Sequence, residues 1–247
     1  MIDERVTALL QSLGEVHPEA CCAGAAGAEI PAGRAHLEQL LQRLFPGCRL
    51  AVVHDTRLVL AAAGLDSGIA LVAGTGSVAY GRRTDGREAQ RGGWGWMLGD
   101  DGSGVWITRE AAREVTSRAD ASKSLGPLGA ALLEACGAGD ARELTAALHA
   151  MREPMSWAAA ASAVFATIET DPASRDIVGR AASALARLVA DVGAELEVEG
   201  PVVMSGGLLE HQPSLETALR ERVPWKVYRL DQPPVAGALR LAEALLE

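Results

Sequence analysis

The chain has 247 residues, 49% of them hydrophobic, which is enough for one large domain or two small ones with a packed core. Its net charge of −9 at pH 7 argues against a nucleic-acid or anionic-membrane surface, because a polyanionic partner is repelled at long range. The sequence has no run of about eighteen apolar residues and no basic, apolar signal segment after Met1, so we expect a cytoplasmic protein.

The first third of the chain predicts helices and strands in alternation. Apolar residues at helical spacing and a closing glycine predict a short helix over residues 4–13. A strand of small residues is expected over 20–26, an amphipathic helix over 34–45 and an apolar strand over 49–54. This order predicts a right-handed parallel crossover whose second strand delivers Asp55 at its carboxyl end.

An antiparallel meander is expected next. Residues 69–73 and 77–82 have strand patterns, and the Asp85-Gly86 turn pairs the second strand with residues 87–91. Strands that alternate with helices in this way predict an α/β fold.

Helices are expected to follow the meander. Ser103 has the side chain of a helix cap, so a helix is predicted over 105–117, with its free amides facing whatever the Asp100-Asp101 loop binds. Further helices are predicted over 125–136, 141–151 and 175–197.

The chain closes with a short strand and a helix. Residues 201–204 form an apolar run that leads into Gly206-Gly207. A helix then begins at Pro233-Pro234. Four of its residues are expected to face inward, Leu239, Ala242, Leu245 and Leu246.

Three glycine-bracketed turns lie within residues 74–104: Gly74-Thr75-Gly76-Ser77, Gly92-Gly93-Trp94-Gly95 and 99–104. Glycine allows positive φ and close approach of an amide to a ligand, so this density indicates a ligand cradle. Ordinary hairpin turns explain the glycines equally well. Amides and hydroxyls of the first turn can hold phosphate oxygens, and Gly206-Gly207 follows a strand in the same manner.

Asp55 stands where a catalytic carboxylate is expected in an α/β protein. As a general base it would accept the proton of an attacking hydroxyl and align that hydroxyl with a phosphoryl group. A helix-capping aspartate is the alternative. His54 precedes it, but adjacent residues of a strand point to opposite faces, so we do not expect the two to form a catalytic pair.

Other charged residues have simpler explanations. Four arginines cluster on the meander and could attract an anionic ligand, but a solvated hairpin is the favoured explanation for them: Arg82, Arg83, Arg87 and Arg91. Asp100 and Asp101 lack the alternating ligands and distal glutamate of a calcium loop, so hydrogen bonds to sugar hydroxyls fit them better than a metal.

With these residues assembled, the chain resembles the BadF/BadG/BcrA/BcrD ATPase family, in particular its N-acetylglucosamine kinase branch within the actin-like, sugar-kinase ATPases. The resemblance is most specific in LVAGTGSVAYGRRTDGREAQRGGWGWMLGDDGSGVWI. It implies two ribonuclease-H-like lobes, over 1–66 and 67–232, the N-terminal one incomplete, with the helix over 233–247 packing back on the first. It also implies that ATP and a hexosamine bind between the lobes.

The resemblance further implies roles for individual residues. Asp55 matches the base that faces the sugar 6-hydroxyl. The phosphate and adenosine motifs are matched by Gly74, Thr75, Gly76, Gly206 and Gly207. The sugar-binding positions are matched by Ser77, Gly93, Trp94, Gly95 and Asp100. ATP and Mg²⁺ are the expected cofactors, and an amino sugar is the expected substrate. The sequence allows a homodimer without fixing the oligomeric state.

One departure stands against these agreements. The family opens with a strand hairpin that carries an Asp-Gly-Gly-Gly-Thr phosphate loop, and nothing before Gly24 resembles it. That loop helps to hold Mg²⁺ and the β- and γ-phosphates, and without its strands a two-stranded remnant with an unpaired edge is expected. Three explanations are open: a late or clipped start, which we favour, a partner that supplies the edge, or loss of catalysis.

Two other functions stay open. One is a binding module that senses a sugar or nucleotide without phosphorylating it. The other is an ATPase that activates a dehydratase through an iron–sulfur cluster, although Cys21, Cys22 and Cys136 do not stand in the cysteine context expected for that cluster.

Overall fold

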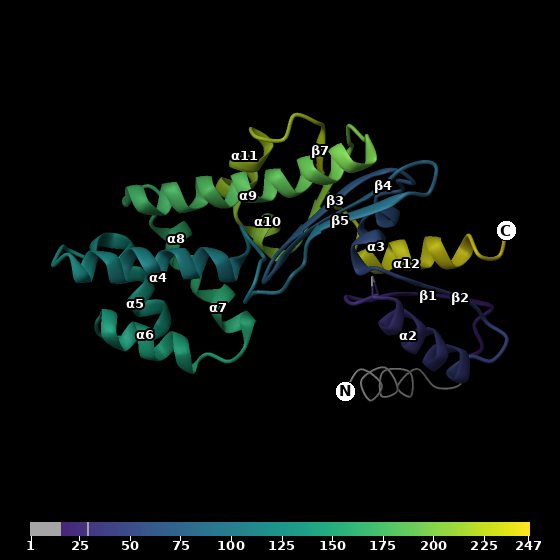
Figure 1. Ribbon diagram of the computed structural model, residues 1–247, viewed down its shortest axis with the longest axis horizontal. Helices are drawn as coiled ribbons and strands as arrows, with labels where there is room; N and C mark the ends of the chain where they lie inside the picture. The colour runs from purple at the N-terminus through teal and green to yellow at the C-terminus, as the bar shows by residue number, and fades with distance from the viewer. Residues whose placement is uncertain (1–15, 29) are drawn as a thin grey trace. The chain divides into compact units, whose positions relative to one another are not determined.

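The computed structural model describes residues 16–28 and 30–247, which form two compact units (Figure 1). Unit 1 holds the described residues up to Asp66 together with Leu230–Glu247, and unit 2 is Ser67–Arg229. The helix predicted over 4–13 lies outside the described residues. Within the described ranges, every helix is too short or too polar to cross a membrane.

Unit 1 is built on a two-stranded parallel sheet of β1 (Ala20–Gly24) and β2 (Arg49–Val53). α2 (Pro31–Leu44) connects the strands and covers one face of the sheet, whereas α3 (Asp55–Ala62) and α12 (Pro234–Glu243) cover the other (Figure 1). The buried stripe of α2 consists of Leu37, Leu40 and Leu41. The predicted parallel pairing is confirmed, while α3 was not predicted.

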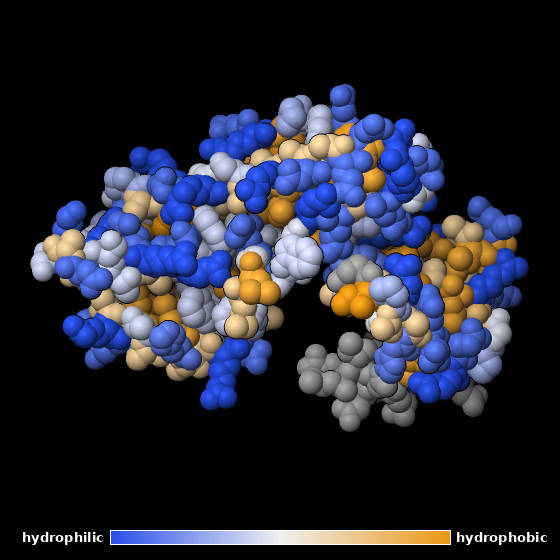
Figure 2. All heavy atoms as spheres, viewed as in Figure 1, coloured by the Kyte–Doolittle hydropathy of each residue, from blue (hydrophilic) through white to orange (hydrophobic). Residues whose placement is uncertain are grey.

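The packing of α12 differs from the prediction. A Cβ atom on Gly237 would lie 2.1 Å from the carbonyl oxygen of Leu58, so the backbones of α12 and α3 touch at this glycine. Leu239 and Leu246, which were expected to face inward, are exposed, and Figure 2 shows apolar side chains gathered on this surface of α12. The prediction was wrong for these two leucines, whereas Ala242 and Leu245 are half-buried, because the close contact of Gly237 with α3 sets which face of the helix packs inward.

Unit 2 carries a five-stranded sheet in the order β5-β4-β3-β6-β7. Its strands are β3 (Gly68–Ala73), β4 (Ser77–Arg82), β5 (Glu88–Gly92), β6 (Val202–Ser205) and β7 (Val227–Arg229). β3 to β5 form the predicted antiparallel meander. β3 and β6 are parallel neighbours, with Val72 beside Ser205, so the turns that follow these two strands lie next to each other.

Helices surround this sheet. α9 (Pro172–Leu196) runs along the face formed by β3, β4 and β5 (Figure 1). The other helices are α4 (Gly104–Asp120), α5 (Gly126–Cys136), α6 (Ala141–Ala150), α7 (Pro154–Ala160), α8 (Ser162–Ala166), α10 (Gly207–His211) and α11 (Pro213–Arg220). α4, α5, α6 and α9 confirm predicted helices, whereas α7, α8, α10 and α11 were not predicted.

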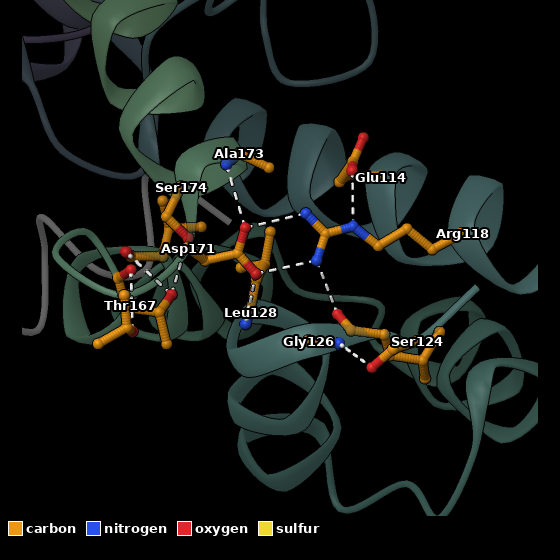
Figure 3. Close-up of polar contacts among 12 residues, drawn as sticks. Glu114, Arg118, Ser124, Gly126, Leu128, Thr167, Asp171, Ala173 and Ser174 are labelled. Carbon is orange, nitrogen blue, oxygen red and sulfur yellow. Dashed lines mark hydrogen bonds and ion pairs between the residues drawn. The ribbon is translucent and has the colours of Figure 1, made fainter.

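A buried ion pair joins three of these helices (Figure 3). Arg118 of α4 donates to both carboxylate oxygens of Asp171, the cap of α9, and also to the carbonyl oxygen of Leu125 before α5. Asp171 accepts further hydrogen bonds from the amides of Leu128 and Ala173. The Arg118 guanidinium lowers the pKa of Asp171 to about 2. One carboxylate thus fixes α4, α5 and α9 against one another.

Candidate active site

The first glycine turn joins β3 to β4 and is held by the loop that precedes α4. The carbonyl oxygen of Gly74 accepts a hydrogen bond from the amide of Gly104 at 2.9 Å. The hydroxyl of Ser77 donates to the carbonyl oxygen of Asp101 at 2.9 Å. These bonds bring the first and third glycine turns of the sequence together.

The start of α4 offers fewer free amides than expected. Ser103 caps the helix as predicted, by accepting from the amide of Trp106 at 3.2 Å. The Gly104 amide is used by Gly74. Two of the first amides of α4 are therefore engaged within the protein, and the expectation that the remaining free amides face a ligand stays a prediction.

Asp100 is buried beneath the first turn. Its carboxylate lies near the backbone amides of Ser77 and Gly95, and burial raises the pKa of the carboxyl above its ordinary value. A Cβ atom on Gly76 would lie 2.6 Å from Asp100 Oδ2, so a larger residue at position 76 would clash with the Asp100 carboxylate. Asp100 links the three glycine turns, while its contact with a sugar stays a prediction.

The second turn presents a tryptophan to solvent. Gly93 and Gly95 have φ values of 73° and 83°, and Trp94 between them is 76% exposed. Trp96, by contrast, packs on Trp157 with ring centroids 6.2 Å apart. Trp94 is therefore available to a ligand, and its sugar-binding role stays a prediction.

The Gly206-Gly207 turn lies beside the first turn because β6 neighbours β3. Gly206 has a φ of 104°, and a Cβ atom there would lie 2.4 Å from the carbonyl oxygen of Ala73, so only glycine fits. Cβ atoms on Gly207 and Gly74 would meet nothing closer than 3.9 and 3.8 Å. The fold itself therefore does not require glycine at 207 and 74.

A pocket of about 350 Å³ lies against these two turns. Gly74, Thr75 and Gly207 line its strand side. Its helical wall was not predicted and includes Ala158, Ala159, Ala161, Ser162, Phe165 and His211. A cavity of this size, with glycine turns on one side and a wall of alanines, Ser162, Phe165 and His211 on the other, fits a nucleotide.

Asp55 is the first residue of α3 in unit 1, and its side chain is 49% exposed. Its Oδ1 atom accepts from the amide of Thr56 at 2.8 Å. His54 Nδ1 lies 3.1 Å from the same oxygen, so the expectation that His54 and Asp55 point apart is wrong. The reason is that the chain turns into a helix at His54, which caps α3. Because the glycine turns belong to unit 2, their approach to Asp55 stays a prediction.

The arginines of the meander are paired with carboxylates. Arg83 pairs with Glu197 at 2.7 Å, and Arg91 pairs with Glu195, where α9 ends. Arg87 lies 3.8 Å from the same Glu197. These ion pairs attach the meander to α9 and agree with a solvated hairpin.

Residues 2–239, which include Asp55 and all the glycine turns, match the family model of the BadF/BadG/BcrA/BcrD ATPases. The chain belongs to the BadF/BadG/BcrA/BcrD ATPase family. The resemblance noted in the sequence is confirmed.

Relatives of this BadF/BadG/BcrA/BcrD protein include two amino-sugar kinases. The N-acetylmuramic acid/N-acetylglucosamine kinase of Clostridium acetobutylicum is 38% identical over 115 residues, which are 46% of this chain and 37% of that kinase. The N-acetyl-D-glucosamine kinase of Dictyostelium discoideum is 28% identical over 182 residues, 69% of this chain and 57% of that kinase. The chain therefore spans less than two thirds of either relative's length.

A solved structure supports the fold of the BadF/BadG/BcrA/BcrD chain. The crystal structure of a candidate N-acetylglucosamine kinase from Chromobacterium violaceum has a TM-score of 0.71 and 26% identity, covering 94% of this chain and 78% of that one. The predicted α/β, actin-like ATPase fold is thereby confirmed.

Proposed function

We propose that this chain carries out ATP-dependent phosphorylation of an amino sugar resembling N-acetylglucosamine, at its 6-hydroxyl. The pocket of about 350 Å³, lined by Gly74, Thr75 and Gly207 at the ends of two neighbouring parallel strands, carries the proposal. The similarity to two N-acetylglucosamine kinases supports the choice of substrate.

Asp55 is the general base of the proposed reaction. Its exposed carboxylate accepts the proton of the sugar hydroxyl while the hydroxyl oxygen bonds to the γ-phosphorus. The bond from that phosphorus to the bridging oxygen breaks, and ADP leaves. Residue 55 suits a base because the Thr56 amide at the start of α3 holds one carboxylate oxygen, while the side chain is 49% exposed and can be reached by a substrate.

The glycine turns supply the electrostatic part of the proposed mechanism. The Gly74 amide closes the turn by donating to the carbonyl oxygen of Gly76, so in the proposed mechanism the amides of Thr75 and Gly76 donate hydrogen bonds to phosphate oxygens, where charge spreads in the transition state. The Gly206-Gly207 turn contacts the adenosine in this proposal, since Gly207 lines the pocket. Trp94 and Asp100 belong to the sugar side.

Magnesium is proposed as the partner of the nucleotide. No cluster of three or more His, Cys, Asp or Glu side chains suited to a metal occurs in the part of the chain that the structure describes. Mg²⁺ is commonly held by substrate phosphates together with one or two protein carboxylates. A metal ion that arrives on the phosphates of ATP therefore does not need a cluster of three protein ligands. Bound Mg²⁺ would neutralise phosphate charge during transfer.

An assay of ADP release tests the proposal. We expect release that requires both ATP and N-acetylglucosamine, with glucosamine and N-acetylmuramic acid as comparison substrates. A thermal shift with sugar or nucleotide in the absence of any turnover would favour the binding module and contradict the kinase. Mass analysis of the product distinguishes the 6-phosphate from other isomers after fragmentation.

A further inference from the structure

His54, Asp55 and Thr56 meet around one backbone amide at the start of α3. The Thr56 amide donates to Asp55 Oδ1 at 2.8 Å and to His54 Nδ1 at 3.3 Å. His54 Nδ1 also lies 3.1 Å from Asp55 Oδ1 and 2.5 Å from Thr56 Oγ1. His54 and Thr56 are buried, whereas Asp55 is half exposed. Two buried side chains therefore support one exposed carboxylate.

The two donors of Thr56 assign the tautomer of His54. A backbone amide only donates, and the Thr56 hydroxyl can donate as well, so we assign Nδ1 as the acceptor and place the proton of the neutral imidazole on Nε2. The same amide occupies Oδ1 of Asp55. Within residues 16–28 and 30–247, Oδ2 of Asp55 has no hydrogen-bond partner. Oδ2 is therefore the oxygen that remains to receive a proton.

We propose that His54 is a positioning residue for Asp55. By capping α3, His54 fixes the Thr56 amide, and this amide holds Oδ1 so that Oδ2 faces outward. The inference rests on the proposed function, in which Asp55 is the base, and it explains how the base keeps one orientation. Orientation is important because a displacement of about 1 Å in an active site can cost about 100-fold in rate.

The ¹⁵N chemical shifts of the imidazole test this contact without any turnover. The signals of His54 are identified among the five histidines by their loss in His54→Asn. At pH 8, where an ordinary imidazole is neutral, we expect Nδ1 without a proton and Nε2 with one. Asp55→Asn should shift the Nδ1 resonance. A proton on Nδ1, or an Nδ1 resonance that ignores Asp55→Asn, would overturn the proposal.

A double-mutant cycle tests the effect on catalysis. His54→Ala should lower kcat about 10- to 100-fold, while KM for the sugar changes by less than about twofold. His54→Asn keeps an acceptor at the cap and should recover most of the loss. In an Asp55→Asn background, His54→Ala should have no further effect, because the positioned group is gone. A full further loss in that background would contradict positioning through Asp55.

Asp140→Ala is the matched control, because Asp140 caps α6 by accepting from the amides of Arg142 and Glu143. α6 holds no proposed site residue, so loss of this cap should destabilise the protein without lowering kcat. If Asp55→Asn leaves turnover unchanged, the proposed role of Asp55 as base is wrong, and the ¹⁵N shifts still test whether His54 contacts Asp55. If Asp55→Asn lowers turnover but His54→Ala does not, Asp55 remains the base, and only the proposal that His54 positions it is wrong.

Discussion

Arg118 donates to both carboxylate oxygens of Asp171, each at 2.9 Å (Figure 3). The side chains are 18% and 2% exposed, so loss of Asp171 leaves a largely buried Arg118 with Glu114 as its remaining carboxylate partner and removes the acceptor of the Leu128 and Ala173 amides. We expect Asp171→Ala to lower the free energy of unfolding by about 3 kcal/mol, measured by urea denaturation. The control is Asp176→Ala, which removes an exposed pair with Arg180 and should cost less than about 1 kcal/mol. Equal losses in the two variants would contradict the prediction.

The same ion pair makes stability depend on pH. The pKa of Asp171 is about 2 in the folded protein, below its ordinary value of 3.8. Because the folded-state pKa is the lower one, the stabilisation is present above about pH 4 and is lost as the pH falls toward 2. Between pH 6 and pH 2.5, the wild type should lose about 1 to 2 kcal/mol more unfolding free energy than Asp171→Asn. Parallel pH curves for the two proteins would show that Asp171 does not titrate in this way.

Gly206 and Gly207 are adjacent, yet alanine should act differently at each. At Gly206 the φ of 104° and the contact with Ala73 make alanine strained, so Gly206→Ala should cost about 2 kcal/mol of stability or more. The Cβ of Gly207→Ala makes only an ordinary van der Waals contact, 3.9 Å from His211, and should change stability by less than about 0.5 kcal/mol. Its methyl group narrows the pocket, so ADP affinity should fall about tenfold, about 1.4 kcal/mol. Calorimetric titration with ADP measures this, and unchanged affinity in Gly207→Ala would remove this turn from the nucleotide site.

The helices predicted from the sequence are those with one buried face. α9 places Ile177, Ala181 and Leu185 on a single stripe, and polar residues occupy the rest of the helix. α3 was missed because most of its residues are buried, so it has no polar face to reveal a helical period. The apolar pattern of Arg49–Val53 predicts a strand that continues through His54, whereas in the structure the strand ends at Val53 and His54 caps α3.

The site was predictable on its strand side only. Glycine turns such as Gly206-Gly207 follow apolar strands directly, and this local signal is visible in the sequence. The opposite wall of the pocket comes from 158–165 and 208–212, which only tertiary structure brings together. The alanine-rich segment around Ala158 has no polar-apolar period and no residue type that marks a binding site.

Trp94 should contribute to sugar binding and very little to stability. Its side chain is 76% exposed, so Trp94→Ala removes few packed atoms, and the unfolding free energy should stay within about 0.5 kcal/mol. Loss of the aromatic face should weaken N-acetylglucosamine binding about 3- to 10-fold by calorimetric titration. Leu98→Ala in the same loop is the control, since Leu98 is 88% exposed and has no proposed role. Equal sugar affinity in the two variants would argue against a contact with Trp94.

Asp55→Asn separates the chemical role of the carboxylate from its structural one. The amide side chain keeps the size of aspartate and an oxygen that can accept from Thr56, so α3 should form as before. It cannot take up the hydroxyl proton, so kcat for ADP release should fall about 10²- to 10⁴-fold, while the dissociation constant of the sugar changes by less than about threefold. Asp85→Asn, an exposed change on the meander hairpin, controls for a general loss of one negative charge. If turnover survived Asp55→Asn, the proton would have to leave through another group, and the carboxylate at the start of α3 would be a helix-terminal aspartate and no catalytic base.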